Sequence, residues 1–191
     1  AVTRLIDVTV AGIALLLASP VIMACAAAIK LESKGPVFYR QVRVGKGNKP
    51  FQILKLRSMR EDAEKTTGPV FANRQDDRIT AVGRLLRKSR LDEVPQLWNV
   101  LRGEMSLVGP RPERPEFVAS LCTRYPHFRL RSFVKPGVTG WAQIRYGYVN
   151  EVNGFVEKLA FDLYYMKYRS VSMDILVLWQ TLKTVALFRG L

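Results

Sequence analysis

Two adjacent carboxylates, Asp92 and Glu93, are the residues whose types and spacing best suit chemistry in this sequence. Pro95 is tolerated in the first turn of a helix, so we expect the pair at the start of a helix that ends at Gly103. Free amides and the positive dipole end at a helix start lower carboxylate pKa values, which would keep both groups ionised. Such a pair can supply a nucleophile and ligands for Mg²⁺. The simpler alternative is a helix cap, with Asp92 at the N-cap.

Three arginines near the pair, Arg87, Arg111 and Arg114, favour phosphate chemistry over a simple cap. Breaking a pyrophosphate bond spreads negative charge over phosphoryl oxygens, and enzymes stabilise that charge with metal ions and fixed cations. Pro110 and Pro112 force an extended backbone around Arg111, which holds its guanidinium in one place. Each arginine could equally be a surface charge, but a cation fixed between two prolines is poorly explained by solvation alone.

The composition narrows the class of protein. His127 is the single histidine, which removes the usual zinc-ligand sets and a Ser-His-Asp triad unless that residue serves. Cys25 and Cys122 show no CxxC spacing, which fits a reducing compartment. The net charge of +14 on 191 residues implies an anionic partner: nucleic acid, an anionic membrane surface or phosphorylated substrates. The hydrophobic fraction of 48% favours the membrane.

The segment from Val8 to Ile29 contains no charged residue and is long enough to cross the hydrocarbon core of a bilayer. Ser19 and Pro20 lie in its middle, and a proline there predicts a bend or break of the helix. A break would permit a re-entrant hairpin with both ends in the cytosol. A straight transmembrane anchor with a tolerated proline kink is an equal alternative on these residues.

The following residues predict a β-hairpin and a basic helix. Strands are expected over 36–44 and 51–57, and alternation places Arg43, Lys55 and Arg57 on exposed faces. Residues 60–76 are polar and are interpreted as a surface loop that could act as a lid. From Ile79 the apolar residues recur at helical spacing with arginines on the other side.

The C-terminal half predicts further helices around a glycine-rich loop. We expect helices over 116–124 and 156–168, the second with a buried Asp162, and a glycine-rich loop over 135–141. The tail from Met173 to Leu191 forms an apolar stripe that either packs on the core or lies at the membrane interface, anchored by Trp179.

These motifs together resemble a known family. The run from Arg87 to Pro112, which includes Leu91-Asp92-Glu93-Val94-Pro95-Gln96 and Gly109-Pro110-Arg111-Pro112, is similar to the bacterial sugar transferases, the monotopic phosphoglycosyl transferases of the undecaprenyl-phosphate pathway. The resemblance extends over nearly the whole chain. It includes the Ser19-Pro20 motif, Asp77-Arg78-Ile79-Thr80, Lys135-Pro136-Gly137-Val138-Thr139-Gly140 and Phe161-Asp162-Leu163-Tyr164-Tyr165.

The resemblance implies an α+β fold that is mainly α. It combines a re-entrant N-terminal membrane helix in residues 1–34 with a cytosolic catalytic domain of residues 35–191, which holds a small β-hairpin, several short helices and amphipathic interfacial helices. The implied location is the cytoplasmic face of the bacterial inner membrane. Because the chain starts at Ala1 and not at Met, we expect either a processed protein or the C-terminal part of a longer one.

The resemblance also implies the reaction and the site. Asp92 would be the nucleophile and Glu93 its partner with Mg²⁺, moving a hexose-1-phosphate from a UDP-sugar to undecaprenyl phosphate through an aspartyl phospho-sugar intermediate and releasing UMP. The implied phosphate-binding and supporting residues are Arg87, Arg111, Arg114, Lys55, Arg43 and, as support, Asp162. Arg90 and Val94 depart from the common family pattern, and we expect neither to touch the chemistry. The sugar is left open.

Two alternatives have no catalytic function. A membrane-surface protein that binds nucleic acid or anionic lipid would explain the charge and the apolar segment, and it would be insensitive to Asp92→Asn. A structural anchor subunit would use the carboxylates only to cap a helix, so that neutralising them would change stability but no rate. Neither alternative explains Pro110-Arg111-Pro112 near the carboxylates, so we favour the enzyme and expect no nucleic-acid partner.

Overall fold

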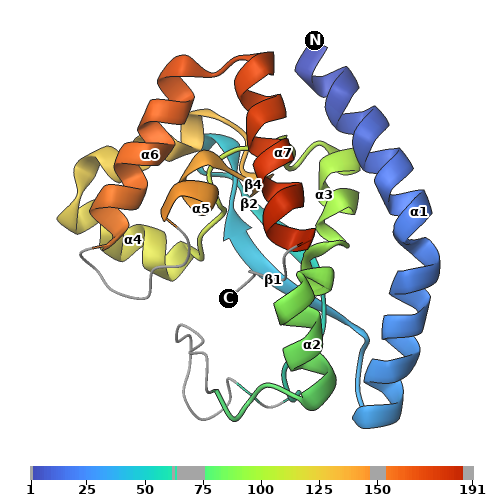
Figure 1. Ribbon diagram of the computed structural model, residues 1–191. Helices are drawn as coiled ribbons and strands as arrows, with labels where there is room; N and C mark the ends of the chain where they lie inside the picture. The colour runs from blue at the N-terminus through green and yellow to red at the C-terminus, as the bar shows by residue number, and fades with distance from the viewer. Residues whose placement is uncertain (1, 62, 64–75, 147–153, 187–191) are drawn as a thin grey trace.

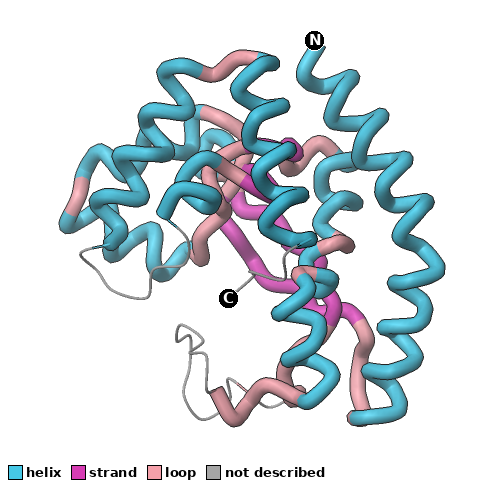
Figure 2. The backbone as a smooth tube through the Cα atoms, viewed as in Figure 1, coloured by secondary structure: helices cyan, strands magenta, loops and turns pink. Residues whose placement is uncertain are grey.

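A computed structural model describes residues 2–61, 63, 76–146 and 154–186 (Figure 1). These residues form a mainly helical fold with two small sheets, β1 with β2 and β3 with β4, as the sequence predicted for an α+β chain (Figure 2). The helices are α1 Val2–Glu32, α2 Ala81–Ser89, α3 Gln96–Arg102, α4 Pro115–Arg124, α5 Trp141–Tyr146, α6 Gly154–Tyr168 and α7 Val171–Ala186. The strands are β1 Phe38–Val44, β2 Pro50–Leu56, β3 Ser106–Val108 and β4 Gly137–Thr139. The 3₁₀ turns are η1 Lys46–Asn48, η2 Leu91–Glu93 and η3 Pro126–Phe133.

Helix α1 continues through Pro20, so of the bend or break predicted at Ser19 and Pro20 the break is excluded, and the bend stays a prediction. Proline cannot donate to the carbonyl of Leu16, four residues earlier, and the Ser19 hydroxyl donates to that oxygen instead at 2.7 Å. The helix therefore keeps its hydrogen bonding over 31 residues, and Figure 1 shows it as one element along the edge of the protein. Only 6% of its most apolar window is buried, and its length and composition suffice to cross a membrane.

The N-terminal end of α1 is attached to the domain by polar contacts. The Arg4 guanidinium donates to the carbonyls of Val100 and Leu101 at the C-terminal end of α3. The buried Asp7 carboxylate accepts hydrogen bonds from the Ser106 hydroxyl at 2.8 Å and from the backbone amide of Leu107 at 3.0 Å. These contacts explain why charged residues lie at the start of an apolar helix.

The C-terminal end of α1 is attached to the same domain. The Glu32 carboxylate accepts from the backbone amide of Ala81 at 2.7 Å, where α2 begins. Beyond the helix, the Arg57 guanidinium donates to the carbonyls of Ser33 at 2.9 Å and Lys34 at 2.7 Å. Both ends of the apolar helix are therefore fixed to one folded unit.

The hairpin forms as predicted, but the exposure of its cations was predicted wrongly. Strands β1 and β2 pair antiparallel, with Arg43 opposite Phe51 and Tyr39 opposite Lys55. The side chains of Arg43 and Lys55 are only 16% and 15% exposed, and Arg57 is buried. The reason is tertiary: η2 and α3 pack on β2, and α4 packs on β1, so the faces that alternation assigns to solvent are covered.

The second sheet lies in the centre of the fold. Strands β3 and β4 pair in parallel, so residues 135–141, predicted as a loop, contain a strand. A Cβ atom on Gly137 would lie 2.1 Å from the backbone nitrogen of Gly109, so this approach requires glycine. The main core packs around these strands and includes Ala11 of α1 and Val177 of α7.

Several other predictions hold. The helices predicted over 116–124 and 156–168 are α4 and α6, and Asp162 is buried. The predicted tail helix is α7, on which Ile175, Trp179 and Leu182 are more than half exposed. Contact of this apolar stripe with a membrane stays a prediction. The predicted lid over 60–76 lies mostly outside the described residues.

Candidate active site

Asp92 and Glu93 lie in η2, a 3₁₀ turn between α2 and α3, and not at the start of the long helix predicted. Helix α2 ends at Ser89, with Arg90 as its C-cap, and α3 begins only at Gln96, after Pro95. Gly103 ends α3 in the left-handed conformation, as predicted. The reason for the difference is local: Arg90 has a φ of 60°, which turns the chain between the two helices and directs both carboxylates inward.

Glu93 is surrounded by cations. Its Oε1 atom lies 2.7 Å from Lys55 Nζ and 2.7 Å from a guanidinium nitrogen of Arg111, and its Oε2 atom lies 3.8 Å from Arg90. Burial raises the pKa of Glu93, but the charges of Arg111, Lys55 and Arg90 outweigh burial and hold that pKa well below its usual range. Glu93 is therefore an anion at neutral pH, and it fixes the cations around the site.

Asp92 has a different environment from its neighbour. It is 7% exposed, and its Oδ1 atom is buried without a hydrogen-bond partner among the described residues. Burial and the charge of Glu93 raise the pKa of Asp92 to about 6, partly offset by Lys55, Arg87 and Arg90. The expectation that a helix dipole keeps this pKa low is wrong, because no helix begins here. At neutral pH the group is mostly ionised and poorly solvated, as a nucleophilic carboxylate requires.

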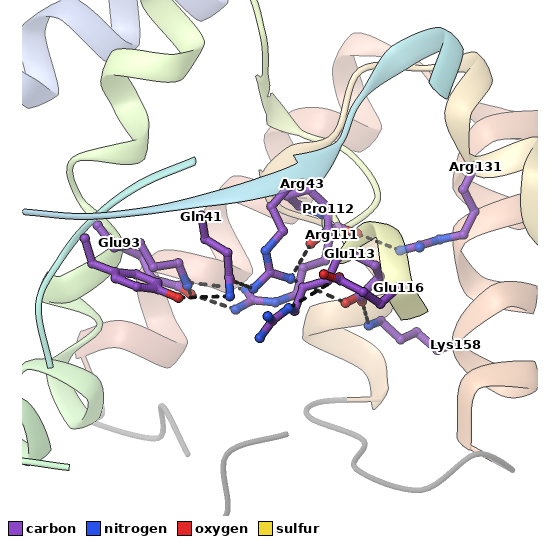
Figure 3. A network of polar contacts seen from close by, with 12 residues as sticks. Gln41, Arg43, Glu93, Arg111, Pro112, Glu113, Glu116, Arg131 and Lys158 are labelled. Atoms are coloured by element: carbon purple, nitrogen blue, oxygen red, sulfur yellow. Dashed lines mark hydrogen bonds and ion pairs between the residues drawn. The ribbon is translucent and has the colours of Figure 1, made fainter. Parts of the chain in front are cut away.

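Arg111 is positioned through its backbone. The Arg131 guanidinium donates to the Arg111 carbonyl at 2.8 Å (Figure 3). The same guanidinium pairs with the buried Asp162 at 2.7 Å. Asp162 is therefore linked to Arg111 through Arg131, and its supporting role stays a prediction. The prolines on both sides restrict the backbone, and the guanidinium points at Glu93.

A second ion pair holds the residues that follow Arg111. The buried Glu113 carboxylate lies 2.7 Å from Lys158 Nζ of α6, and Arg43 donates to the Pro112 carbonyl at 3.1 Å (Figure 3). Burial raises the pKa of Glu113, but Lys158 and Arg131 outweigh it and lower that pKa to about 2. Sequence reasoning missed Glu113, Lys158 and Arg131. A signal existed, since Lys158 lies between Phe155 and Leu159 on the apolar face of its helix.

The remaining predicted cations divide into two groups. The Arg87 side chain donates to the Ser58 hydroxyl at 2.9 Å, and its charge acts on Asp92. The Arg114 guanidinium lies 3.6 Å from the Glu116 carboxylate and 5.8 Å from the centre of the Phe117 ring, both in α4. The structure thus brings Lys55, Arg87 and Arg111 to the carboxylates, together with Arg90, whereas Arg43 pairs with Glu113 and Arg114 pairs with Glu116.

The site can accommodate a cation at one place. Among the described residues no group of three or more His, Cys, Asp or Glu side chains is arranged to hold a metal ion. The free Oδ1 of Asp92 is the atom best suited to a divalent cation, because both oxygens of Glu93 face cationic side chains. Mg²⁺ commonly binds through one or two carboxylates, with water and substrate phosphates as its other ligands, so a single carboxylate is compatible with it.

A family model for bacterial sugar transferases matches residues 1–188 of this chain. The chain belongs to the bacterial sugar transferase family. The predicted resemblance is therefore confirmed over nearly the whole sequence.

Relatives within this family carry out sugar-phosphate transfer according to their names. The UDP-N-acetylgalactosamine-undecaprenyl-phosphate N-acetylgalactosaminephosphotransferase of Aeromonas hydrophila is 45% identical over 184 residues, which is 96% of this chain and 43% of that protein. The UDP-glucose:undecaprenyl-phosphate glucose-1-phosphate transferase of Caulobacter vibrioides is 43% identical over 188 residues, covering 95% of this chain and 68% of that protein. The Escherichia coli transferase of the same name is 41% identical, covering 92% and 38%. This chain thus spans less than half of two of these relatives.

Proposed function

We propose that this chain transfers a hexose-1-phosphate from a UDP-sugar to undecaprenyl phosphate and releases UMP. The observation that carries the proposal is the Asp92 carboxylate, which is buried beside several cations and has one oxygen without a hydrogen-bond partner in the part of the chain that the structure describes. The names of relatives support the substrates, since they combine a UDP-sugar with undecaprenyl phosphate. These names differ in the sugar, so the donor panel in the experiment below is needed to identify the hexose.

The proposed reaction has two displacements at one phosphorus atom. The Asp92 carboxylate attacks the sugar-bearing phosphorus of the donor, and the bond from that phosphorus to the bridging oxygen breaks, so UMP leaves with the bridging oxygen. A phosphate oxygen of undecaprenyl phosphate then attacks the same phosphorus and releases the carboxylate. The product is an undecaprenyl diphosphate sugar, and Asp92 returns to its starting state.

The surrounding side chains support this chemistry electrostatically. Lys55 and Arg111 are fixed by Glu93 before substrate binds, so they need little reorganisation when charge develops on the phosphoryl oxygens. Arg87 acts on Asp92 from α2. Mg²⁺ held through Asp92 would further neutralise the donor phosphates.

We also propose that α1 is a re-entrant membrane helix and that the domain lies on the cytoplasmic face of the inner membrane. The N-terminal end of α1 contacts α3 and its C-terminal end contacts α2, so both ends belong to one folded unit. A helix of 31 residues is about 46 Å long at 1.5 Å per residue, yet it runs beside this unit over much of that length. Attachment of both ends to one folded unit supports a topology in which both ends lie on the same side of the bilayer. The exposed apolar side chains of α1 and α7 would then enter one leaflet.

The test is UMP release by the purified chain in lipid nanodiscs with Mg²⁺, undecaprenyl phosphate and a panel of UDP-sugars. We expect release from one donor, a burst of UMP without acceptor, and a protein mass increased by one sugar phosphate. Asp92→Asn should abolish all three signals, whereas Glu157→Gln, at an exposed carboxylate of α6, should keep them. Full activity of Asp92→Asn would refute the role of this residue, and no release from any donor would refute the function.

A further inference from the structure

Arg90 has a backbone conformation that its residue type disfavours. Its φ of 60° and ψ of 12° lie in the left-handed region, where a helix C-terminal position usually carries glycine or asparagine. A residue other than glycine held there costs on the order of 1 kcal/mol or more, and such strain tends to persist at functional sites. The side chain of Arg90 should therefore have a use that offsets this cost.

The guanidinium of Arg90 pairs with Glu93, although the sequence analysis expected this residue not to touch the chemistry. It lies 3.8 Å from Glu93 Oε2, whereas Lys55 and Arg111 lie 2.7 Å from Oε1. Its side chain is 24% exposed, compared with 15% for Lys55 and 18% for Arg111. Among the described cations that pair with Glu93, Arg90 is thus the most exposed and the farthest from a carboxylate oxygen.

The charge balance of the site leaves room for an anion. Lys55, Arg87, Arg90 and Arg111 carry positive charge, and the two ionised carboxylates of the dyad carry negative charge. Two positive charges therefore remain in excess before any Mg²⁺ binds, which favours an anionic ligand such as a nucleotide diphosphate ester. Lys55 and Arg111 are needed to hold Glu93, so the excess is most available at Arg87 and Arg90.

We propose that Arg90 is a direct ligand of the donor diphosphate, released from Glu93 when the nucleotide sugar binds. The proposal rests on the proposed function for the identity of the donor. Arginine suits this task because its guanidinium can bind two phosphate oxygens at once in a planar geometry. Glycine or asparagine at this position would remove the backbone strain but would also remove the phosphate contact.

The test measures binding of UDP, which is not turned over, by isothermal titration calorimetry in nanodiscs. Arg90→Gly and Arg90→Gln should weaken UDP binding by about 10- to 100-fold, the effect of losing a charge-assisted hydrogen bond. Arg90→Lys should recover part of the loss. Lys88→Gln, at an exposed cation two residues earlier, should stay within about twofold of the parent, because a solvated charge contributes little.

Protein stability separates this role from misfolding. Glycine suits the left-handed conformation, so Arg90→Gly should keep the melting temperature of the parent or raise it while UDP binding falls. Parent-like UDP binding by Arg90→Gly, or equal losses in Arg90→Gly and Lys88→Gln, would overturn the proposal. A parent protein that binds UDP but releases no UMP would refute the proposed function alone, and one that binds no UDP would refute both.

Discussion

The two adjacent carboxylates of η2 should affect folding stability in opposite directions. Burial and Glu93 raise the pKa of Asp92 from 3.8 to about 6, so its charge is a cost to the folded state at neutral pH. Glu93 has a pKa held well below its usual range, despite its burial, by Arg111 and Lys55, so its charge stabilises the fold. Asp92→Asn should therefore stabilise the protein at pH 8, and Glu93→Gln should destabilise it.

The size of each effect follows from these contacts. A rise of about 2 pKa units corresponds to roughly 3 kcal/mol at ~1.4 kcal/mol per unit. An asparagine amide without partners in the same buried place would cost about 1–2 kcal/mol, leaving a net gain of roughly 1–2 kcal/mol. Glu93→Gln leaves Lys55 and Arg111 buried without their anion, which costs about 3–5 kcal/mol.

The pH dependence gives the sign of each contribution. The folded pKa of Asp92 exceeds its unfolded value, so the cost of its charge is complete above pH 6 and disappears below pH 4. The gain from Asp92→Asn should shrink across that window as the pH falls. The folded pKa of Glu93 is depressed, so its stabilising charge is present above its ordinary value of 4.5 and is lost only in stronger acid.

Thermal unfolding followed by tryptophan fluorescence at pH 8 and pH 4, at one scan rate in one detergent, measures these effects. For a protein of this size, 1 kcal/mol shifts the melting temperature by about 2–4 °C. Glu157→Gln, at an exposed site, is the control and should leave the melting temperature unchanged at both pH values. A lower melting temperature for Asp92→Asn at pH 8, or a gain of the same size at pH 4, would refute the electrostatic explanation.

Four further predictions follow from other contacts. The kcat/KM of UMP release should fall about tenfold per pH unit below pH 6, where Asp92 becomes protonated; a flat profile down to pH 5 would contradict a nucleophilic carboxylate. Lys158→Met should lower the free energy of unfolding by about 3 kcal/mol in denaturation assays and reduce kcat more than it raises KM in rate assays, because Glu113 loses its ion pair and the segment that carries Arg111 is released. Lys158→Arg should recover part of both losses. Single cysteines placed at Val2 and at Lys34 in a chain without its native cysteines should react with an impermeant maleimide from the same side of inverted vesicles, and opposite sides would exclude a re-entrant helix. Trp179→Asp on α7 should reduce flotation with anionic vesicles severalfold while leaving the melting temperature within about 2 °C, since the side chain is 68% exposed.

The parts of the fold that short-range chemistry determines were predictable from the sequence. The hairpin register is fixed by its turn, and α3 ends where Gly103 adopts a positive φ. The apolar segment forms one helix, although Pro20 does not break it, because the adjacent Ser19 hydroxyl satisfies the freed carbonyl. This compensation depends on the rotamer of the Ser19 side chain, which cannot be predicted from the presence of a proline in the helix.

The electrostatic environments of the two carboxylates in the candidate site were not predictable from the sequence. Sequence reasoning gave Asp92 and Glu93 different roles but expected a helix start to keep the pKa values of both low. In the structure Lys55 and Arg111 donate to Glu93, 38 and 18 positions away, whereas Oδ1 of Asp92 has no hydrogen-bond partner among the described residues. Glu113 and Lys158 pair across 45 positions, and no periodicity in either segment predicts such a contact.

The arrangement of α1 explains how the dyad can keep an unfavourable geometry. Arg4 places a cation at the C-terminal end of α3, and Glu32 places an anion at the N-terminal end of α2, which are the favourable signs for the two helix dipoles. The two ends of one apolar helix thus hold the far ends of the two helices between which η2 lies. Because those far ends are fixed, the connecting turn cannot relax by letting either helix move. The left-handed Arg90 and the Asp92 oxygen that has no hydrogen-bond partner within the described ranges are therefore maintained by contacts outside the site, which is the condition under which a strained site persists.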